Sequence, residues 1–175
     1  MITKKQALKY GAILVVGLAL VPFVIYAVPQ VAGADHSYVV LSESMQPAIR
    51  AGDAILVASV PPQTIDKGDI ITFRAGAVQG VQGDAPVVTH RVAKVKQTKT
   101  GVKFRTKGDG NEKPDPEPVA ANDVIGQVKY TIPYLGFAVA FASTTKGFLL
   151  LVALPVALLV VNEVWMLTKA WRNTR

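Results

Sequence analysis

The chain has 175 residues, of which 50% are hydrophobic and 18% charged, and it contains no cysteine. This composition excludes a disordered or collagen-like chain, a disulfide framework and a thiolate nucleophile or metal ligand. The formal net charge is +7, but the basic excess flanks two apolar stretches and coats no central segment. It therefore indicates membrane topology, and we expect no nucleic-acid partner, no cofactor and no metal ion.

The first apolar stretch, residues 11–28, follows a short N-terminus (1–9) that carries three lysines. A membrane-spanning helix needs roughly 20 apolar residues, whereas the apolar region of a cleaved signal peptide has about 7 to 15. The length therefore predicts a retained transmembrane anchor over residues 10–29, kinked at Pro22. The small residues at 32–34 leave open the alternative of a signal peptide cleaved after Ala34.

Residues 30–137 predict a small, mainly antiparallel β domain. Residues 54–60 and 69–74 are short, rich in β-branched side chains and opened by Gly-Asp turns. Residues 86–96 and 101–107 alternate between apolar and polar side chains, as half-buried strands do. The connections at 61–62, 76–86 and 108–118 are rich in proline and glycine. In the strand 86–96, the face expected to be buried carries Val88, His90 and Val92, and Lys94 is expected on the same face.

The C-terminal part predicts a second transmembrane helix. Residues 134–142 are apolar but too short to span, so they form either a core strand or an apolar lip on the bilayer, continuing into a juxtamembrane segment, 138–146. Residues 147–168 are long enough to span, and a tail, 169–175, carries three basic residues. Because Lys and Arg are retained on the cytoplasmic side, both termini are expected there, and the domain outside.

Ser44 is a candidate nucleophile. It lies in the run Ser42-Glu43-Ser44-Met45-Gln46-Pro47, between an apolar run and the turn at 50–53. A serine hydroxyl reacts only at an accessible position with a base beside it. The competing interpretation is a serine-rich junction between a strand and a loop.

Three further side chains are candidates to assist a serine. His90 is a suitable general base, although a lone histidine on an apolar face is often a hydrogen-bonded core residue. His36 is expected to be a surface residue. Asp109 lies in Lys-Gly-Asp-Gly-Asn, and Asp115 lies between two prolines that restrict it to extended geometry, which suits a carboxylate that orients an imidazole. A solvated proline-rich loop is the alternative for Asp115.

Taken in chain order, these motifs resemble those of type I signal peptidases. The resemblance covers residues 38–137 and lies with the branch found in the endoplasmic reticulum, archaea and some Gram-positive bacteria. It rests on four ordered motifs: Ser-Glu-Ser-Met-Gln-Pro (42–47), Thr-His-Arg-Val (89–92), Lys-Gly-Asp-Gly-Asn (107–111) with Asp115 beyond it, and Ile-Pro-Tyr-Leu-Gly (132–136). The bacterial branch has a Lys-Arg pair in place of His90-Arg91.

The resemblance implies a membrane-bound serine endopeptidase. It makes Ser44 the nucleophile, His90 the general base, Asp115 the residue that orients the histidine and Asp109 a supporting residue. Ser42 matches the serine that helps to form the oxyanion hole, and Met45 is a plausible wall of the substrate site. The substrates implied are exported preproteins, cut after small residues at positions −1 and −3.

The resemblance also implies where the enzyme works and with what. The expected partners are preproteins, the lipid bilayer and the secretion translocon. The location is the cell membrane, or the endoplasmic reticulum membrane in a eukaryote, with a multi-pass chain whose catalytic domain is extracytoplasmic.

Three alternatives remain open at this level. One is a membrane-anchored β module that binds partners without catalysis. Another is a self-cleaving protease of the repressor type, with Lys94 as base. We also hypothesise that the enzyme occasionally cleaves itself after Ala34, because Ala32-Gly33-Ala34 resembles a substrate site.

Overall fold

The fold is described from a computed structural model, in which residues 4–76, 86–99 and 101–173 are placed. It has two compact units, one ending at Gly136 and the other comprising Phe137–Arg175. The predicted turn at 76–86 lies almost entirely outside the described residues.

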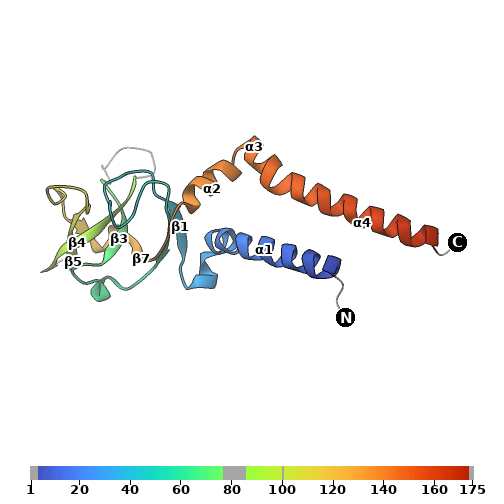
Figure 1. Cartoon of the computed structure of the whole chain (residues 1–175). Helices are drawn as coiled ribbons and strands as arrows, with labels where there is room; N and C mark the ends of the chain where they lie inside the picture. Colours follow the sequence, from blue (N-terminus) through green and yellow to red (C-terminus); the bar gives the residue numbers. More distant parts are fainter. Residues whose placement is uncertain (1–3, 77–85, 100, 174–175) are drawn as a thin grey trace. The chain divides into compact units, whose positions relative to one another are not determined.

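The first unit carries the strands of the described chain (Figure 1). Its elements are α1 (Lys4–Ala27), η1 (Pro29–Ala32), β1 (His36–Val39), β2 (Ala54–Ala58), η2 (Pro62–Thr64), β3 (Ile70–Arg74), β4 (Val87–Thr98), β5 (Gly101–Lys107), β6 (Val119–Ala120), η3 (Ala121–Asp123) and β7 (Val124–Ile132). The strands form one antiparallel sheet in the order β1-β2-β7-β3-β4-β5-β6. The prediction of a mainly antiparallel β domain is confirmed.

Four of the strands, β2, β3, β4 and β5, occupy the segments that the β-branched residues and the alternation predicted. Glycines with positive φ open two of them, since Gly52 (φ 91°) precedes β2 and Gly68 (φ 103°) precedes β3. The central strand β7 was missed, although it pairs with both β2 and β3. Its sequence alternates less clearly because Gly126 and Lys129 interrupt the apolar positions.

The prediction for Lys94 was wrong. Strand β4 pairs Val92 with Thr106 and Lys94 with Arg105, so Ala93 is an extra residue that forms a bulge. A one-residue bulge exchanges the faces of the side chains that follow it. Val95 therefore packs against the core, while Lys94 is exposed and lies on the face opposite to His90.

Two hydrophobic clusters hold the sheet. The larger one consists of Ile65, Ile71, Phe73, Val92, Val102, Phe104 and Val119. The second, which we call the Met45 cluster, consists of Met45, Ile49, Ile55 and Val57. Burying a side chain such as Met45 stabilises the fold by about 1.5–3 kcal/mol, so this cluster fixes the loop that carries Ser44.

The segment after α1 is part of the fold, which argues against the hypothesis of self-cleavage after Ala34. Gly33 ends η1 in a left-handed conformation, and Ala34 is only 2% exposed. The N–H of Asp35 donates to the Val57 carbonyl, and the Asp35 carboxylate accepts from the Ser59 N–H. The bond between Ala34 and Asp35 is thus held against β2, so cleavage would require this segment to unfold.

The second unit is helical. Helix α2 (Leu135–Ala142) begins in the first unit, and α3 (Thr145–Phe148), η4 (Leu149–Ala153) and α4 (Leu154–Asn173) follow. The core-strand interpretation of 134–142 was therefore wrong, because periodicity does not distinguish a strand from a helix in so short an apolar run. The η4 segment is π-helical and ends two residues before Pro155, which cannot donate the regular helical hydrogen bond.

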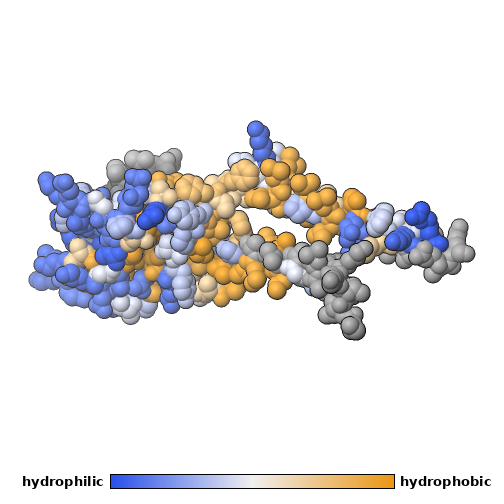
Figure 2. Space-filling view, in the orientation of Figure 1, coloured by the Kyte–Doolittle hydropathy of each residue, from blue (hydrophilic) through white to orange (hydrophobic). Residues whose placement is uncertain are grey.

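The helices carry exposed apolar side chains, which Figure 2 shows along α2 and α4, while polar side chains gather over β4 and β5. Among the described residues, one helix is long and apolar enough to cross a membrane, Thr145–Met166, and only 6% of its apolar window is buried. A shorter apolar helix, Val16–Ala27, lies within α1. A helix that is apolar on all sides suits a lipid environment or a protein interior.

Gly126 provides a stability test, because a Cβ at this position would lie within 2.9 Å of Val57 Cγ1 and would collide with the Ala58 carbonyl. We expect Gly126→Ala to lower the free energy of unfolding by about 1–3 kcal/mol, the usual effect of overpacking. Denaturant unfolding of the detergent-solubilised chain, followed by circular dichroism, measures this. Gly17→Ala is the control, since nothing lies within 4 Å of its Cβ; an equal loss in both variants would contradict the expectation.

Candidate active site

Ser44 begins the turn after the irregular segment that follows β1 and is partly buried. The loop after β5 packs directly against its backbone, because the Gly110 N–H donates to the Ser44 carbonyl at 2.8 Å. A Cβ on Gly108 would lie 2.5 Å from the same carbonyl oxygen. The two glycines of Lys-Gly-Asp-Gly-Asn thus allow a close approach of two backbones that a larger residue would prevent.

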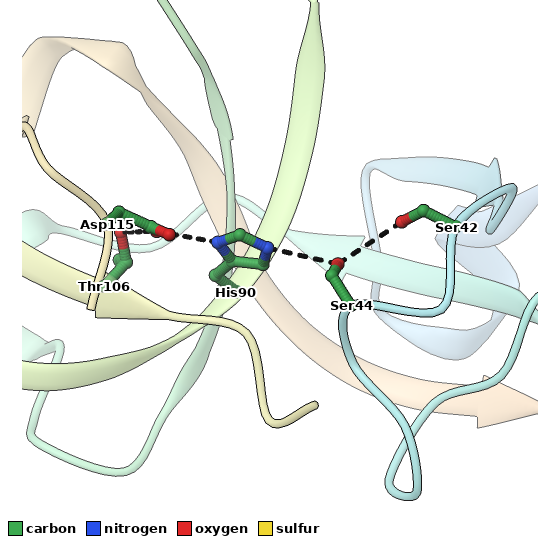
Figure 3. Close-up of polar contacts among 5 residues, drawn as sticks. All are labelled: Ser42, Ser44, His90, Thr106 and Asp115. Atoms are coloured by element: carbon green, nitrogen blue, oxygen red, sulfur yellow. Dashed lines mark hydrogen bonds and ion pairs between the residues drawn. The ribbon is translucent and has the colours of Figure 1, made fainter. Parts of the chain in front are cut away.

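His90 lies on β4 and is 8% exposed, on the face that the alternation predicted. Its Nε2 lies 3.1 Å from Ser44 Oγ, and its Nδ1 lies 2.7 Å from Asp115 Oδ2 (Figure 3). The structure therefore brings Ser44, His90 and Asp115, which are 46 and 25 residues apart, into one chain of hydrogen bonds.

Asp115 is held by Thr106, which the sequence analysis did not single out. The Thr106 hydroxyl donates to Asp115 Oδ2 at 2.6 Å, and the Asp115 N–H donates to the Thr106 carbonyl at 2.8 Å. Thr106 is 0% exposed and lies opposite Val92 in the sheet. Its place among the buried positions of β5 was visible in the alternation, but its contact with a loop nine residues away was not.

The hydrogen-bond acceptors among Ser44, His90 and Asp115 determine which nitrogen of the imidazole carries the proton. A carboxylate only accepts hydrogen bonds, so an ionised Asp115 requires His90 Nδ1 to donate. A neutral imidazole then has an unprotonated Nε2, which accepts from the Ser44 hydroxyl. This is the tautomer in which the histidine can remove the serine proton.

Ser42 and Met45 flank Ser44. The Ser42 hydroxyl lies 3.3 Å from Ser44 Oγ and is exposed. Met45 is 2% exposed and belongs to the Met45 cluster. Both residues line a groove of about 450 Å³. Its other lining residues are Tyr38, Val39, Val40, Leu41, Ser44, Ile49, Ile55, Val87, Val88 and Thr89.

Asp109 lies apart from this chain of hydrogen bonds, in an ion pair with Arg91. Arg91 donates to both carboxylate oxygens, at 2.8 and 2.6 Å, and also to the Gly68 carbonyl. The hydrogen bonds from Arg91 lower the pKa of Asp109 below its usual value, against the opposing effect of desolvation. Asp109 therefore holds the loop 107–111, which we call the glycine loop, to Arg91, the residue next to His90. As expected, His36 is exposed.

No family model matches the chain. It is 37% identical over 107 residues to the human protein named signal peptidase complex catalytic subunit SEC11C, covering 56% of this chain and 52% of that protein. It is also 35% identical over 99 residues to signal peptidase I W of Bacillus subtilis, covering 56% of this chain and 45% of that protein.

The chain is a relative of the signal peptidases. A third match, the putative human catalytic subunit SEC11B, is 30% identical over 114 residues, covering 61% of this chain and 65% of that protein. The resemblance to type I signal peptidases of the endoplasmic-reticulum type, inferred from the four motifs, is confirmed. The chain spans about half the length of the signal peptidases it first matches, 52% for SEC11C.

The ion pair between Asp109 and Arg91 should make the stability of the fold depend on pH in the acid range. The pKa of Asp109 is lower in the folded state than the usual value of 3.8. The ion pair therefore stabilises the fold fully at pH values above 3.8. This contribution is lost as the pH falls through the lower pKa of the folded state. We expect Asp109→Asn to unfold at a lower temperature than wild type at pH 7, with the difference shrinking at pH 3. Thermal unfolding at the two pH values measures it; an equal difference at both would contradict the ion-pair explanation.

Proposed function

We propose that this chain is a membrane-bound serine endopeptidase that removes signal peptides from exported preproteins. The observation that carries the proposal is the chain of hydrogen bonds from Ser44 through His90 to Asp115, at 3.1 and 2.7 Å. The names of two relatives, a signal peptidase complex catalytic subunit and signal peptidase I W, support the same activity. A binding module without catalysis would not require these three side chains to converge.

In this proposal Ser44 Oγ attacks the carbonyl carbon of the peptide bond, and His90 Nε2 accepts its proton. The tetrahedral intermediate collapses as the imidazolium returns that proton to the leaving amine, and the acyl group remains on Ser44. Water, deprotonated by His90, then hydrolyses the ester and releases the signal peptide. Asp115, held by Thr106, keeps the imidazole in the required tautomer and stabilises its charge. Asp109 is a supporting residue that acts on the loop.

The oxyanion formed in each step needs donors directed at it. We assign this role to the Ser42 hydroxyl and the Ser44 N–H, as the resemblance implies. The 3.3 Å separation of the two serine oxygens supports this assignment, because it brings the Ser42 hydroxyl close to the reacting atom. Loss of one such donor typically raises the barrier by about 3 kcal/mol.

The groove is the proposed substrate site. One wall is the segment 38–42, and the other is the beginning of β4, where residues 87–90 pair with β3 and where β5 joins only at Arg91. No described strand pairs with residues 87–90 on the side away from β3, so an extended peptide can form backbone hydrogen bonds there. The apolar floor, formed by Met45, Ile49 and Ile55, suits the small residues at −1 and −3 that the resemblance implies.

The proposed setting is a membrane that the chain spans twice, with the domain at 30–137 outside it. The apolar helix Thr145–Met166 and the basic residues on the outer flanks of both apolar stretches support this topology. The residues before and after the stretches, 1–9 and 169–175, then lie in the cytoplasm. A bilayer confines enzyme and preprotein to the same surface and so raises their effective concentration. The proposed partners are preproteins, lipid and the translocon.

Replacement of Ser44 tests the activity. Detergent-solubilised wild type is expected to cut a preprotein after a small residue, whereas Ser44→Ala should lose at least about 10³-fold in kcat, as serine proteases without their nucleophile do. Gel electrophoresis and mass spectrometry of the products measure this. Ser59→Ala, at an exposed serine after β2, is the control. If wild type, Ser44→Ala and the control all leave the preprotein intact, the proposed function fails in favour of a binding module.

Thr106 provides a second test. Thr106→Val keeps the shape of the side chain but removes its hydrogen bond to a charged acceptor, a loss of about 1.5–3 kcal/mol. We expect kcat to fall by about ten- to a hundredfold with KM unchanged, because the hydroxyl acts on Asp115 and not on the substrate. Thr106→Ser should restore most of the activity. An unchanged kcat in folded Thr106→Val would show that Asp115 needs no help from this hydroxyl.

A further inference from the structure

A second cavity, of about 630 Å³, borders the other end of the hydrogen-bond chain. His90 and Asp115 line it, whereas Ser42 and Ser44 line the groove. Figure 3 shows the two serines on one side of the imidazole and Asp115 on the other. The remaining lining residues are Phe73, Arg74, Ala75, Gly76, Val88, Pro116, Glu117, Pro118, Val119 and Asp123. Val88 borders both cavities, so the two are adjacent at the start of β4.

The pairing of β3 with β4 shows which face the second cavity occupies. Phe73 lies opposite Val88, and Ile71 lies opposite His90, so these side chains share one face of the sheet. Thr89 lies on the other face, where its hydroxyl is 2.9 Å from that of Thr72. The second cavity therefore opens on the face of Val88 and His90.

An extended peptide alternates its side chains in the same way. If it lies along residues 87–89, the side chains at −1 and −3 point to one face and the side chain at −2 points to the other. The groove, with Met45 and Ile55 in its floor, takes the −1 and −3 side chains under the proposed function. The −2 side chain is then directed to the face on which Val88 and His90 lie.

We propose that the second cavity is the binding site for the substrate side chain at −2. This inference rests on the proposed function and extends it, because it assigns a pocket and specificity residues to a position between the two small ones. Phe73, Val88 and Val119 give the cavity an apolar interior, and its volume exceeds that of the groove, 630 against 450 Å³. A bulky side chain at −2 is accepted there.

The charges around the cavity favour one charge of the substrate side chain at −2 over the other. Glu117 is exposed and Asp123 is half-buried, and Arg74 is the basic residue among the lining residues. Asp115 adds a third carboxylate, although His90 and Thr106 both donate to it. The cavity therefore favours a long side chain with an apolar stem and a cationic end over an anionic one. Of two substrates that differ only at −2, the one with Lys is preferred over the one with Glu.

Filling the cavity tests its size. Ala75 lines it and is half-buried at the end of β3. Ala75→Phe should lower kcat/KM for a peptide with Phe at −2 by at least about tenfold, while a peptide with Ala at −2 is cut as by wild type. The comparison within one variant separates pocket filling from misfolding, which lowers both rates. Loss for neither peptide, or equal loss for both in a variant whose circular dichroism and unfolding match wild type, would overturn the assignment.

Charge reversal tests the specificity residue. Wild type should cut the Lys peptide about fivefold faster in kcat/KM than the Glu peptide, as expected for a partly exposed charge pair. Glu117→Lys should abolish or invert this ratio. Glu112→Lys, at an exposed glutamate on the same loop that does not line the cavity, should leave the ratio unchanged. The same shift in both variants would mean a general surface potential and would overturn the proposal.

The inference and the proposed function fail in different ways. If wild type cuts all the peptides with the same kcat/KM, the signal peptidase activity stands and the −2 pocket does not. If wild type cuts none of them, nor a full-length preprotein, the activity itself fails, and the pocket with it. Competition by the product peptides, which end at the −1 carboxylate, gives the same Lys-to-Glu comparison without turnover.

Discussion

The 2.7 Å contact between His90 and Asp115 is the interaction on which the proposed chemistry depends, because it decides which nitrogen of the imidazole carries the proton. With Nδ1 donating to a carboxylate, Nε2 is left to accept from Ser44. The contact is supported in turn by Thr106, which holds both the carboxylate and the backbone of Asp115. A histidine placed on a strand without these partners would be an ordinary buried residue.

The sheet brings these groups together from three separate parts of the chain. His90 and Thr106 lie on the paired strands β4 and β5, whereas Ser44 and Asp115 lie in loops that pack over them. The glycine loop connects the loop of Ser44 to the strand of His90. Gly110 donates to the Ser44 carbonyl, and Asp109 pairs with Arg91 beside His90. Strands thus position His90, the proposed base, and a loop anchored by the buried Met45 positions Ser44, the proposed nucleophile.

The bulge at Ala93 limits the chemistry to one candidate base on this part of β4. By exchanging the faces after Val92, it turns Lys94 outward and keeps the apolar side chain of Val95 in the core. Among the residues described on this strand, His90 is therefore the one that meets Ser44. Lys94 therefore gives no support to a lysine-based mechanism of the repressor type.

The sequence by itself determined the β class of the domain, four of its strands, the two apolar stretches and the motifs that identify its relatives. Each of these is local: alternation, apolar length and residue spacing act within about ten positions along the chain.

The tertiary structure decided what local patterns cannot encode. The pairing of β7 with β2 and β3 and the bulge after Val92 depend on which strands meet in the sheet. The support of Asp115 by Thr106 depends on how the loop after β5 folds back on that strand. Asp109 shows the difference most clearly, because the resemblance gave it only a supporting role without naming a partner, whereas the structure pairs it with Arg91. Which of two nearby groups a carboxylate contacts depends on distances of a few ångströms, and only the folded chain fixes these.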